Sequence, residues 1–253
     1  MNAATCAART GRQVSLREFP KSARSRAAGV WAFRARAEAI ASGRFVQLGR
    51  DLADVNAPQV VVELAQRAAE EEARHIEICM ELVECLGAHI EKPATPDFRL
   101  PEQLKNKQRM VLLQMVGTSC INETISATVL AEMMRRAESG QMHDSIQEIL
   151  RDEIDHGRMG WAYVAHLAQQ GEVGFVGERL PFLLEAAIED ELFDTPDPDD
   201  PDAATMCLGA LPKVERARLF QSAVSDLILP GLEHFGIDTT AGQKWLNTRA
   251  ASR

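Results

Sequence analysis

The chain has 253 residues, of which 45% are hydrophobic, 26% charged and only 5% aromatic. It is long enough for a large domain with a buried core, and too apolar for a disordered polymer. Few aromatic residues and many Ala, Leu, Glu and Arg residues argue against an all-β fold. The formal net charge is −9, and the basic residues are concentrated near the N-terminus, so the remainder of the chain is strongly acidic. An acidic body repels phosphate, so we expect no nucleic-acid partner.

The five cysteines, an odd number without a C-x-x-C pair, indicate free thiols in a reducing, cytoplasmic environment. The N-terminal residues 1–23 are rich in Arg, Ala and Ser and contain no apolar core of a secretory signal. We predict a disordered basic arm there, with an organellar transit peptide as the alternative. No charge-free stretch reaches the roughly 18 residues that a membrane span needs, so no membrane partner is expected.

Four long helices separated by clear breakers are predicted next, over residues 24–52, 58–87, 101–140 and 142–170. At 1.5 Å per residue they are roughly 40–55 Å long. The connection between the second and third contains Pro93 and Pro96 and is expected to be extended, whereas the other two connections are short. The sequence therefore predicts an all-α four-helix bundle of two antiparallel hairpins, with a long crossover between helices 2 and 3.

The pattern weakens after Gly171. Helices are predicted over residues 178–193 and 214–229, with an acidic, proline-broken linker at 194–202 and a short helix near the C-terminus. We interpret residues 171–253 as a helical C-terminal extension that packs on the bundle of residues 24–170, rather than as a separate enzyme domain.

Each long helix has an apolar stripe that a carboxylate or an imidazole interrupts near mid-length. The interrupting residues are Glu38, Glu72, His75, Glu123, Glu153 and His156. Glu38 and Glu123 have no acidic neighbour nearby in the sequence, so neither belongs to a solvated charged face. The pattern instead predicts four carboxylates and two histidines inside the core.

Burying a carboxylate costs several kcal/mol, so four in one core need compensation. Two divalent metal ions would supply four positive charges against them. Residues three positions apart share a helix face, so the two side chains of each Glu-x-x-His pair can bind the same ion. The alternative is that buried arginines or hydrogen bonds hold the carboxylates. No Lys or Arg shares these faces near mid-helix, which favours metal.

The chain also repeats its own pattern, because a lone Glu precedes each Glu-x-x-His by about 30 residues. This ligand set resembles that of the ferritin-like di-iron carboxylate superfamily, in its oxygenase and rubrerythrin-like branch, over residues 24–170. The resemblance implies that Glu38, Glu72 and His75 bind one iron ion. It implies equally that Glu123, Glu153 and His156 bind the other, with Glu72 and one of Glu123 and Glu153 bridging. Arg74, Asp152 and Asp155 are candidates for orienting these ligands.

The leading functional hypothesis is a non-haem di-iron oxidoreductase that activates O2 to oxidise a small organic substrate, using an external electron donor. Fe/Fe is the expected pair, with Mn/Fe or Mn/Mn as alternatives, and homodimers are common in the resembled family. Small residues beside the ligands either leave room for a substrate or allow close helix packing; they are Ala35, Ser42, Ser119, Ala127 and Gly160. Two other functions stay open: a ferroxidase or peroxide-scavenging rubrerythrin-like protein, and a non-catalytic helical binding protein stabilised by metal.

Overall fold

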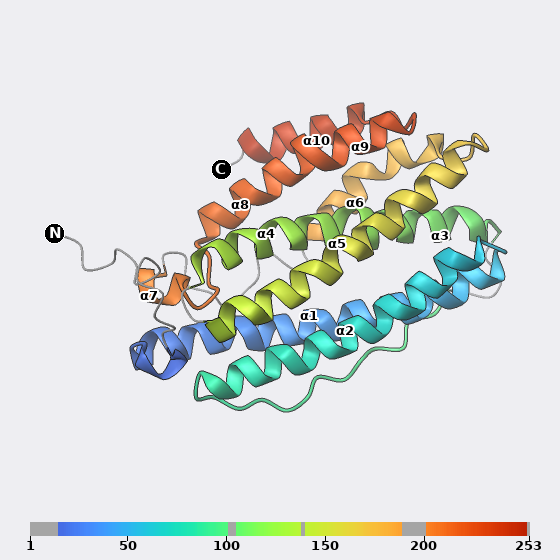
Figure 1. Cartoon of the computed structure of the whole chain (residues 1–253). Coiled ribbons are helices and arrows are strands. Elements are labelled where there is room, and N and C mark those ends of the chain that lie inside the picture. The colour runs from blue at the N-terminus through green and yellow to red at the C-terminus, as the bar shows by residue number, and fades with distance from the viewer. Residues whose placement is uncertain (1–14, 101–104, 138–139, 189–200, 252–253) are drawn as a thin grey trace.

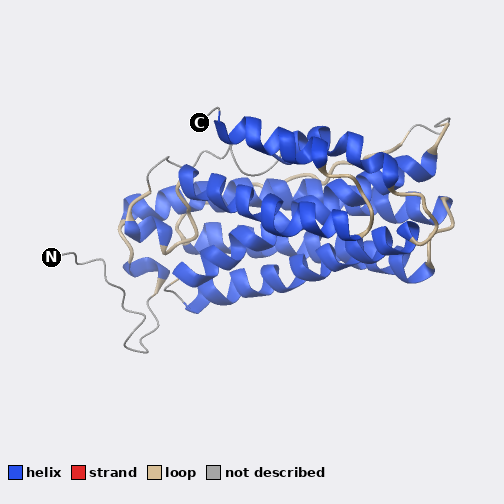
Figure 2. Cartoon of the chain, turned by 90° about the horizontal axis from the view of Figure 1, so that it is seen from above, coloured by secondary structure: helices blue, strands red, loops and turns tan. Residues whose placement is uncertain are grey.

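The computed structural model describes residues 15–100, 105–137, 140–188 and 201–251. Every regular element in these ranges is a helix, and Figure 2 shows helices joined by loops, without a strand in the described part. The predicted all-α class is therefore confirmed. None of the described helices is long and apolar enough to cross a membrane. Parts of three predicted segments lie outside the described residues. They are residues 1–14 of the arm, residues 194–200 of the acidic linker, and the end of the helix predicted at 178–193.

The first two long helices, α1 (Lys21–Asp54) and α2 (Gln59–Cys85), lie side by side and antiparallel (Figure 1). Proline precedes each of them, at a position where a missing backbone N–H removes no intrahelical hydrogen bond. Alanine is the most frequent residue on the buried face of α1 and allows close approach, so that Ser42 Oγ on α1 donates a hydrogen bond to the backbone oxygen of Ala69 on α2 at 3.1 Å. This pair forms one side of the molecule.

The described end of the predicted basic arm is structured. Ser15 and Glu18 form a reciprocal capping box around the short helix η2 (Leu16–Glu18), and α1 begins at Lys21. Leu16 and Ala23 are buried in the main core. The boundary predicted at residue 24 was therefore wrong, because a capped turn and a buried leucine tie residues 15–23 to the core.

The connection from α2 to α3 contains no helix or strand over residues 88–100 and runs back along the α1–α2 pair (Figure 1). Gly43 on α1 makes this path possible, since a Cβ there would lie 2.3 Å from the backbone oxygen of Pro96. Arg50 of α1 also pairs with Asp97 at 2.9 Å. The connection is thus held against α1 by close packing and by charge.

The third long helical segment is interrupted by a π-helix. Its parts are α3 (Lys107–Met115), η3 (Val116–Asn122) and α4 (Glu123–Arg136). The prediction assumed a regular helix from about 101 to 140, and a π turn changes which residues face inward. Leu113 and Ala127 of this segment are only partly buried. The fourth long helix, α5 (Gly140–Ala168), packs against α4, η3 and α2.

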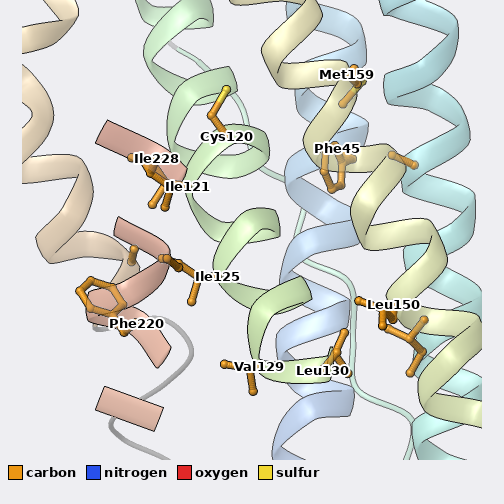
Figure 3. Close-up of a cluster of buried hydrophobic side chains, with 14 of the residues drawn as sticks. Phe45, Cys120, Ile121, Ile125, Val129, Leu130, Leu150, Met159, Phe220 and Ile228 are labelled. Atoms are coloured by element: carbon orange, nitrogen blue, oxygen red, sulfur yellow. The ribbon is translucent and has the colours of Figure 1, made fainter. Parts of the chain in front are cut away.

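The C-terminal extension is helical where it is described. Its elements are η4 (Gly174–Arg179), α6 (Leu180–Ala187), α7 (Ala203–Met206), α8 (Lys213–Ser222), η6 (Ala223–Ile228), α9 (Leu229–His234) and α10 (Thr240–Ala251). Figure 1 shows α6 and α8–α10 on the outside of α4 and α5, away from α1 and α2. In Figure 3, Ile121 and Ile125 point toward Ile228 and Phe220 of the extension, and all four belong to one hydrophobic core.

Candidate metal centre

The structure brings the six predicted ligand residues together between the long helices. Glu38 comes from α1, Glu72 and His75 from α2, Glu123 from α4, and Glu153 and His156 from α5. Each is at most 5% exposed. They form two overlapping groups, in each of which one ligand atom per residue lies within 4.8 Å of the others: Glu38, Glu72, His75 and Glu153, and Glu72, Glu123, Glu153 and His156. Glu72 and Glu153 belong to both groups.

Several buried ligand atoms have no hydrogen-bond partner among the described residues. They are both carboxylate oxygens of Glu72, Oε2 of Glu153 and Nδ1 of both histidines. The histidine Nδ1 atoms lie 3.4 Å (His75) and 3.0 Å (His156) from the Glu72 oxygens, close enough for ion pairs when the imidazoles are protonated but not aligned as hydrogen bonds. A buried polar atom without a hydrogen bond costs about 1–3 kcal/mol. A cation placed among these atoms would satisfy them together, and we therefore regard the cluster as fit to hold metal.

The other nitrogen of each histidine is held by a carboxylate from the opposite helix. His75 Nε2 on α2 lies 3.2 Å from Asp152 Oδ2 on α5, and His156 Nε2 on α5 lies 3.0 Å from Glu71 Oε2 on α2. Anchoring Nε2 orients the ring and presents Nδ1 to the centre, which is how outer carboxylates commonly support metal-binding histidines.

Sequence reasoning found part of this outer layer. Asp152 contacts His75, and Arg74 pairs with Asp152 in turn. Asp155 does not reach the cluster, because its half-exposed side chain pairs with Arg158 at 2.8 Å. Glu71 was missed as a partner of His156. The repeated motif could have indicated this role, because Glu71 precedes Glu72 as Asp152 precedes Glu153.

Burial and charge shift the ionisation of the cluster in opposite directions. Burial raises the pKa of Glu38 well above its usual range, and Arg34 only partly offsets this. Burial also favours protonated Glu72, but the two adjacent imidazoles outweigh it and lower the pKa of this carboxyl. For His75 burial acts downward, yet Asp152 and Glu72 raise its pKa to about 11. In the metal-free protein, protonated histidine therefore supplies positive charge that a metal ion would replace.

Arg34 contradicts one expectation from the sequence. It lies one turn before Glu38 on α1, and its Nε is 2.7 Å from Glu38 Oε1. Its Nη2 donates to Glu153 Oε1 at 3.1 Å. A basic residue does therefore reach the carboxylates, because a long side chain spans a helical turn. It brings one positive charge beside four carboxylates, so it compensates them only in part.

A cavity of about 60 Å³ borders the cluster, enough for several water molecules. Its lining includes Glu38, Glu72, Glu123 and Glu153 from the long helices, and Gly209, Leu211 and Arg216 from the extension. Of the small residues considered above, Ala35, Ser42, Ser119 and Gly160 do not line it. Ala127 lines a second, more open groove that also borders Glu123 and Glu153. At Gly160 a Cβ would lie 2.5 Å from Ser119 Cβ. That glycine therefore serves close helix packing.

The fold and the site together define a helical protein with a buried carboxylate–histidine cluster between its long helices. Comparison of the sequence with protein-family models gives no match, and comparison with curated proteins gives none either. What the cluster does is therefore inferred from its own geometry and chemistry.

Proposed function

We propose that this protein is a non-haem di-iron oxidoreductase built on a ferritin-like four-helix bundle. The four helices of the bundle are α1, α2, the α3–η3–α4 segment and α5, with the extended connection after α2 as its crossover. The observation that carries the proposal is the convergence of buried atoms from Glu72, Glu153, His75 and His156 that make no aligned hydrogen bond. Carboxylate and imidazole donors in this mixture suit iron or manganese.

The two overlapping groups suggest how the ligands divide. Glu38 and His75 would belong to one ion, and Glu123 and His156 to the other. Glu72 and Glu153 occur in both groups, so each is a candidate bridge. Among the alternatives left open by the sequence, this favours Glu153 over Glu123 as the second bridging carboxylate.

The iron pair would supply the electrons and the open coordination positions needed to activate O2 for oxidation of a small organic molecule. The chain's own residues orient and enclose this centre. Asp152 and Glu71 hold the two imidazoles, Arg34 pairs with Oε1 of Glu38 and of Glu153, and the extension lines part of the adjacent cavity. An external protein or small molecule would have to return electrons to the centre after each turnover.

Metal analysis after anaerobic reconstitution with ferrous iron tests this proposal first. We expect about two iron ions per chain, as in carboxylate-bridged pairs, and oxidation of the bound iron on exposure to air. Glu123→Ala should lower the iron content while circular dichroism stays helical. Fewer than about 0.2 metal ions per chain after reconstitution would contradict a dinuclear site.

The same experiment separates the other two functions. Continued oxidation of added ferrous iron, well beyond the two bound ions, would favour a ferroxidase. A cavity beside the carboxylates that the extension helps to line favours an organic substrate instead. Bound metal that stabilises the fold but does not react with O2 or peroxide would indicate a non-catalytic binding protein.

A further inference from the structure

A groove of about 700 Å³ lies on the bundle where the extension crosses α4 and α5. Its walls come from α4, α5, η6 and α9, and Figure 1 shows α9 on the outside of α5. Glu123 and Glu153 belong to its lining and are at most 5% exposed, so the groove extends from the surface to two of the ligand residues. Its volume is within the range of about 300–1,000 Å³ that is typical of small-molecule sites.

A glycine keeps the groove open beside Glu123. A Cβ built at Gly157 of α5 would lie 3.8 Å from Glu123 Cβ and 3.7 Å from the backbone oxygen of Ser119. These are ordinary van der Waals contacts, so helix packing does not require a glycine there. Gly231 of α9 differs, because a Cβ there would lie 2.9 Å from the Trp161 ring. Gly231 therefore allows α9 to pack on α5, whereas Gly157 leaves space beside a ligand residue.

The groove presents apolar surface to solvent. Ile154 of α5 is 41% exposed and Leu227 of η6 is 53% exposed, and both line it. Ala127 and Ala131 of α4 add small apolar side chains to the lining. An apolar molecule that covers these side chains removes them from water, which favours binding in proportion to the area covered.

The charged residues at the surface end of the groove already have partners within the chain. Arg158 pairs with Asp155 at 2.8 Å. Asp226 accepts hydrogen bonds from Ser222 at 2.8 Å and from Ser225 at 2.6 Å. At the other end, the two ligand carboxylates would be neutralised by bound metal ions. The groove thus has one basic and one acidic side chain at its surface end, both paired, and this balance favours an uncharged ligand.

We propose that this groove binds an uncharged, largely apolar organic molecule whose inner end lies beside Glu123. Ile154 and Leu227 cover its sides, and Ala127 and Gly157 determine how closely it approaches the cluster. These four are assigned as specificity-determining residues. That this molecule is the one oxidised rests on the proposed function, whereas its binding does not.

Fluorine NMR titration of the full-length protein, metal-free and loaded with Zn²⁺, tests this assignment. The probes are para-fluorotoluene, para-fluorobenzoate and para-fluorobenzylammonium, which have similar size but different charge. We expect fluorotoluene to bind both forms of the protein, on the order of tenfold more tightly than either ion. Ala127→Phe should fill the groove and weaken fluorotoluene binding about tenfold or more, and Leu227→Gln about three- to tenfold. Val60→Gln changes a residue of α2 that is 59% exposed and does not line the groove. It is the matched control and should bind as the unaltered protein does.

Loading with Mn²⁺ instead of Zn²⁺ locates the ligand, because a paramagnetic ion broadens the resonance of a molecule bound near it. We expect broadening of the fluorotoluene signal that Ala127→Phe abolishes. Because Leu227 is exposed, Leu227→Gln keeps the test decisive if Ala127→Phe fails to fold.

Preferential binding of either ion, or fluorotoluene binding that neither groove variant changes, would overturn the assignment even in an iron-loaded, O2-reactive protein. A dimer that Leu227→Gln dissociates, in a protein that binds no fluorotoluene, would overturn it equally, because a second copy of the chain would then cover the groove. Groove-dependent fluorotoluene binding in a protein that takes up no metal would support the assignment and contradict the proposed function.

Discussion

The two Glu-x-x-His motifs supply similar parts to the centre, yet their surroundings differ. His75 is held by Asp152, whose side chain is 1% exposed and also contacts Arg74 and Arg151. His156 is held by Glu71, whose side chain is 10% exposed and pairs with the surface residue Arg67 at 2.8 Å. The two copies of the motif therefore lie in unequal surroundings. We name the group Glu38, Glu72, His75 and Glu153 the His75 half, and the group Glu72, Glu123, Glu153 and His156 the His156 half.

Arg34 adds to this difference. It contacts Glu38, which belongs only to the His75 half, and Glu153, which belongs to both. Arg34 thus adds positive charge beside Glu38 in the His75 half. If the two halves bind metal independently, we expect them to differ in affinity and in their response to pH. Four predictions test how far this inequality extends.

The largest effect is expected from Glu72→Gln, because Glu72 belongs to both halves. The change keeps the shape of the side chain but removes the charge that lies between the two histidines. We expect iron content after reconstitution to fall from about two ions per chain to nearly none, measured by elemental analysis. Glu70→Gln, at an exposed position on the same helix, should retain both ions. A variant that kept a full complement of iron would show that Glu72 is not shared.

Arg34→Met should destabilise the metal-free protein by about 3 kcal/mol, the lower end of the cost of removing one partner from a buried ion pair. Glu38 and Glu153 would then lose their nearest fixed positive charge. Metal ions would replace this charge, so loading with Mn²⁺ should recover most of the loss. Urea unfolding with and without metal measures both quantities. Arg36→Met, exposed on the same helix, should change stability by no more than about 0.5 kcal/mol, and a similar loss in both variants would argue against a role specific to Arg34.

Asp152→Asn and Glu71→Gln compare the two halves directly. Removing an outer carboxylate that orients a metal-binding histidine costs about 10–100-fold in metal affinity. We expect the larger loss for Asp152→Asn, since Asp152 is the more buried partner and water cannot readily replace it. Competition with a chelator provides the two dissociation constants, with Asp155→Asn as the surface control. Equal losses would show that the difference in burial has no energetic consequence.

The remaining effect, spread over several pH units, is a gradual dependence of metal-free stability on pH. Because the folded-state pKa of His75 is raised to about 11, its stabilisation is complete below its unfolded pKa of about 6.5. That stabilisation is lost as the pH rises from there through 11. For Asp152, His75 and Arg151 outweigh burial and lower the pKa to about 2. Its contribution is therefore present above about pH 3.8 and is lost as the pH falls through 2.

Urea unfolding between pH 6 and 10 (about the range in which histidine pKa shifts are expressed) tests the alkaline branch. The metal-free protein should lose stability across this interval, whereas His75→Gln should show a shallower slope. A slope unchanged by His75→Gln would mean that another group carries the dependence.

The sequence by itself determined the helical class, the approximate extent of the long helices and the buried positions of the six ligand residues. These depend on local periodicity: an apolar stripe every three to four residues places Glu72 and His75, or Glu153 and His156, on one inward face. Boundaries were less accurate where a capped turn or the π-helix η3 replaced regular helix.

Tertiary structure decided which residues from distant segments meet. Arg34 reaches Glu153 across 119 positions of sequence, and Glu71 meets His156 across 85. Gly209 of the extension lies against Trp31 of α1, and both Gly209 and Arg216 line the cavity beside the cluster. Periodicity within one helix carries no information about such pairs, because they depend on how helices are rotated and packed against each other.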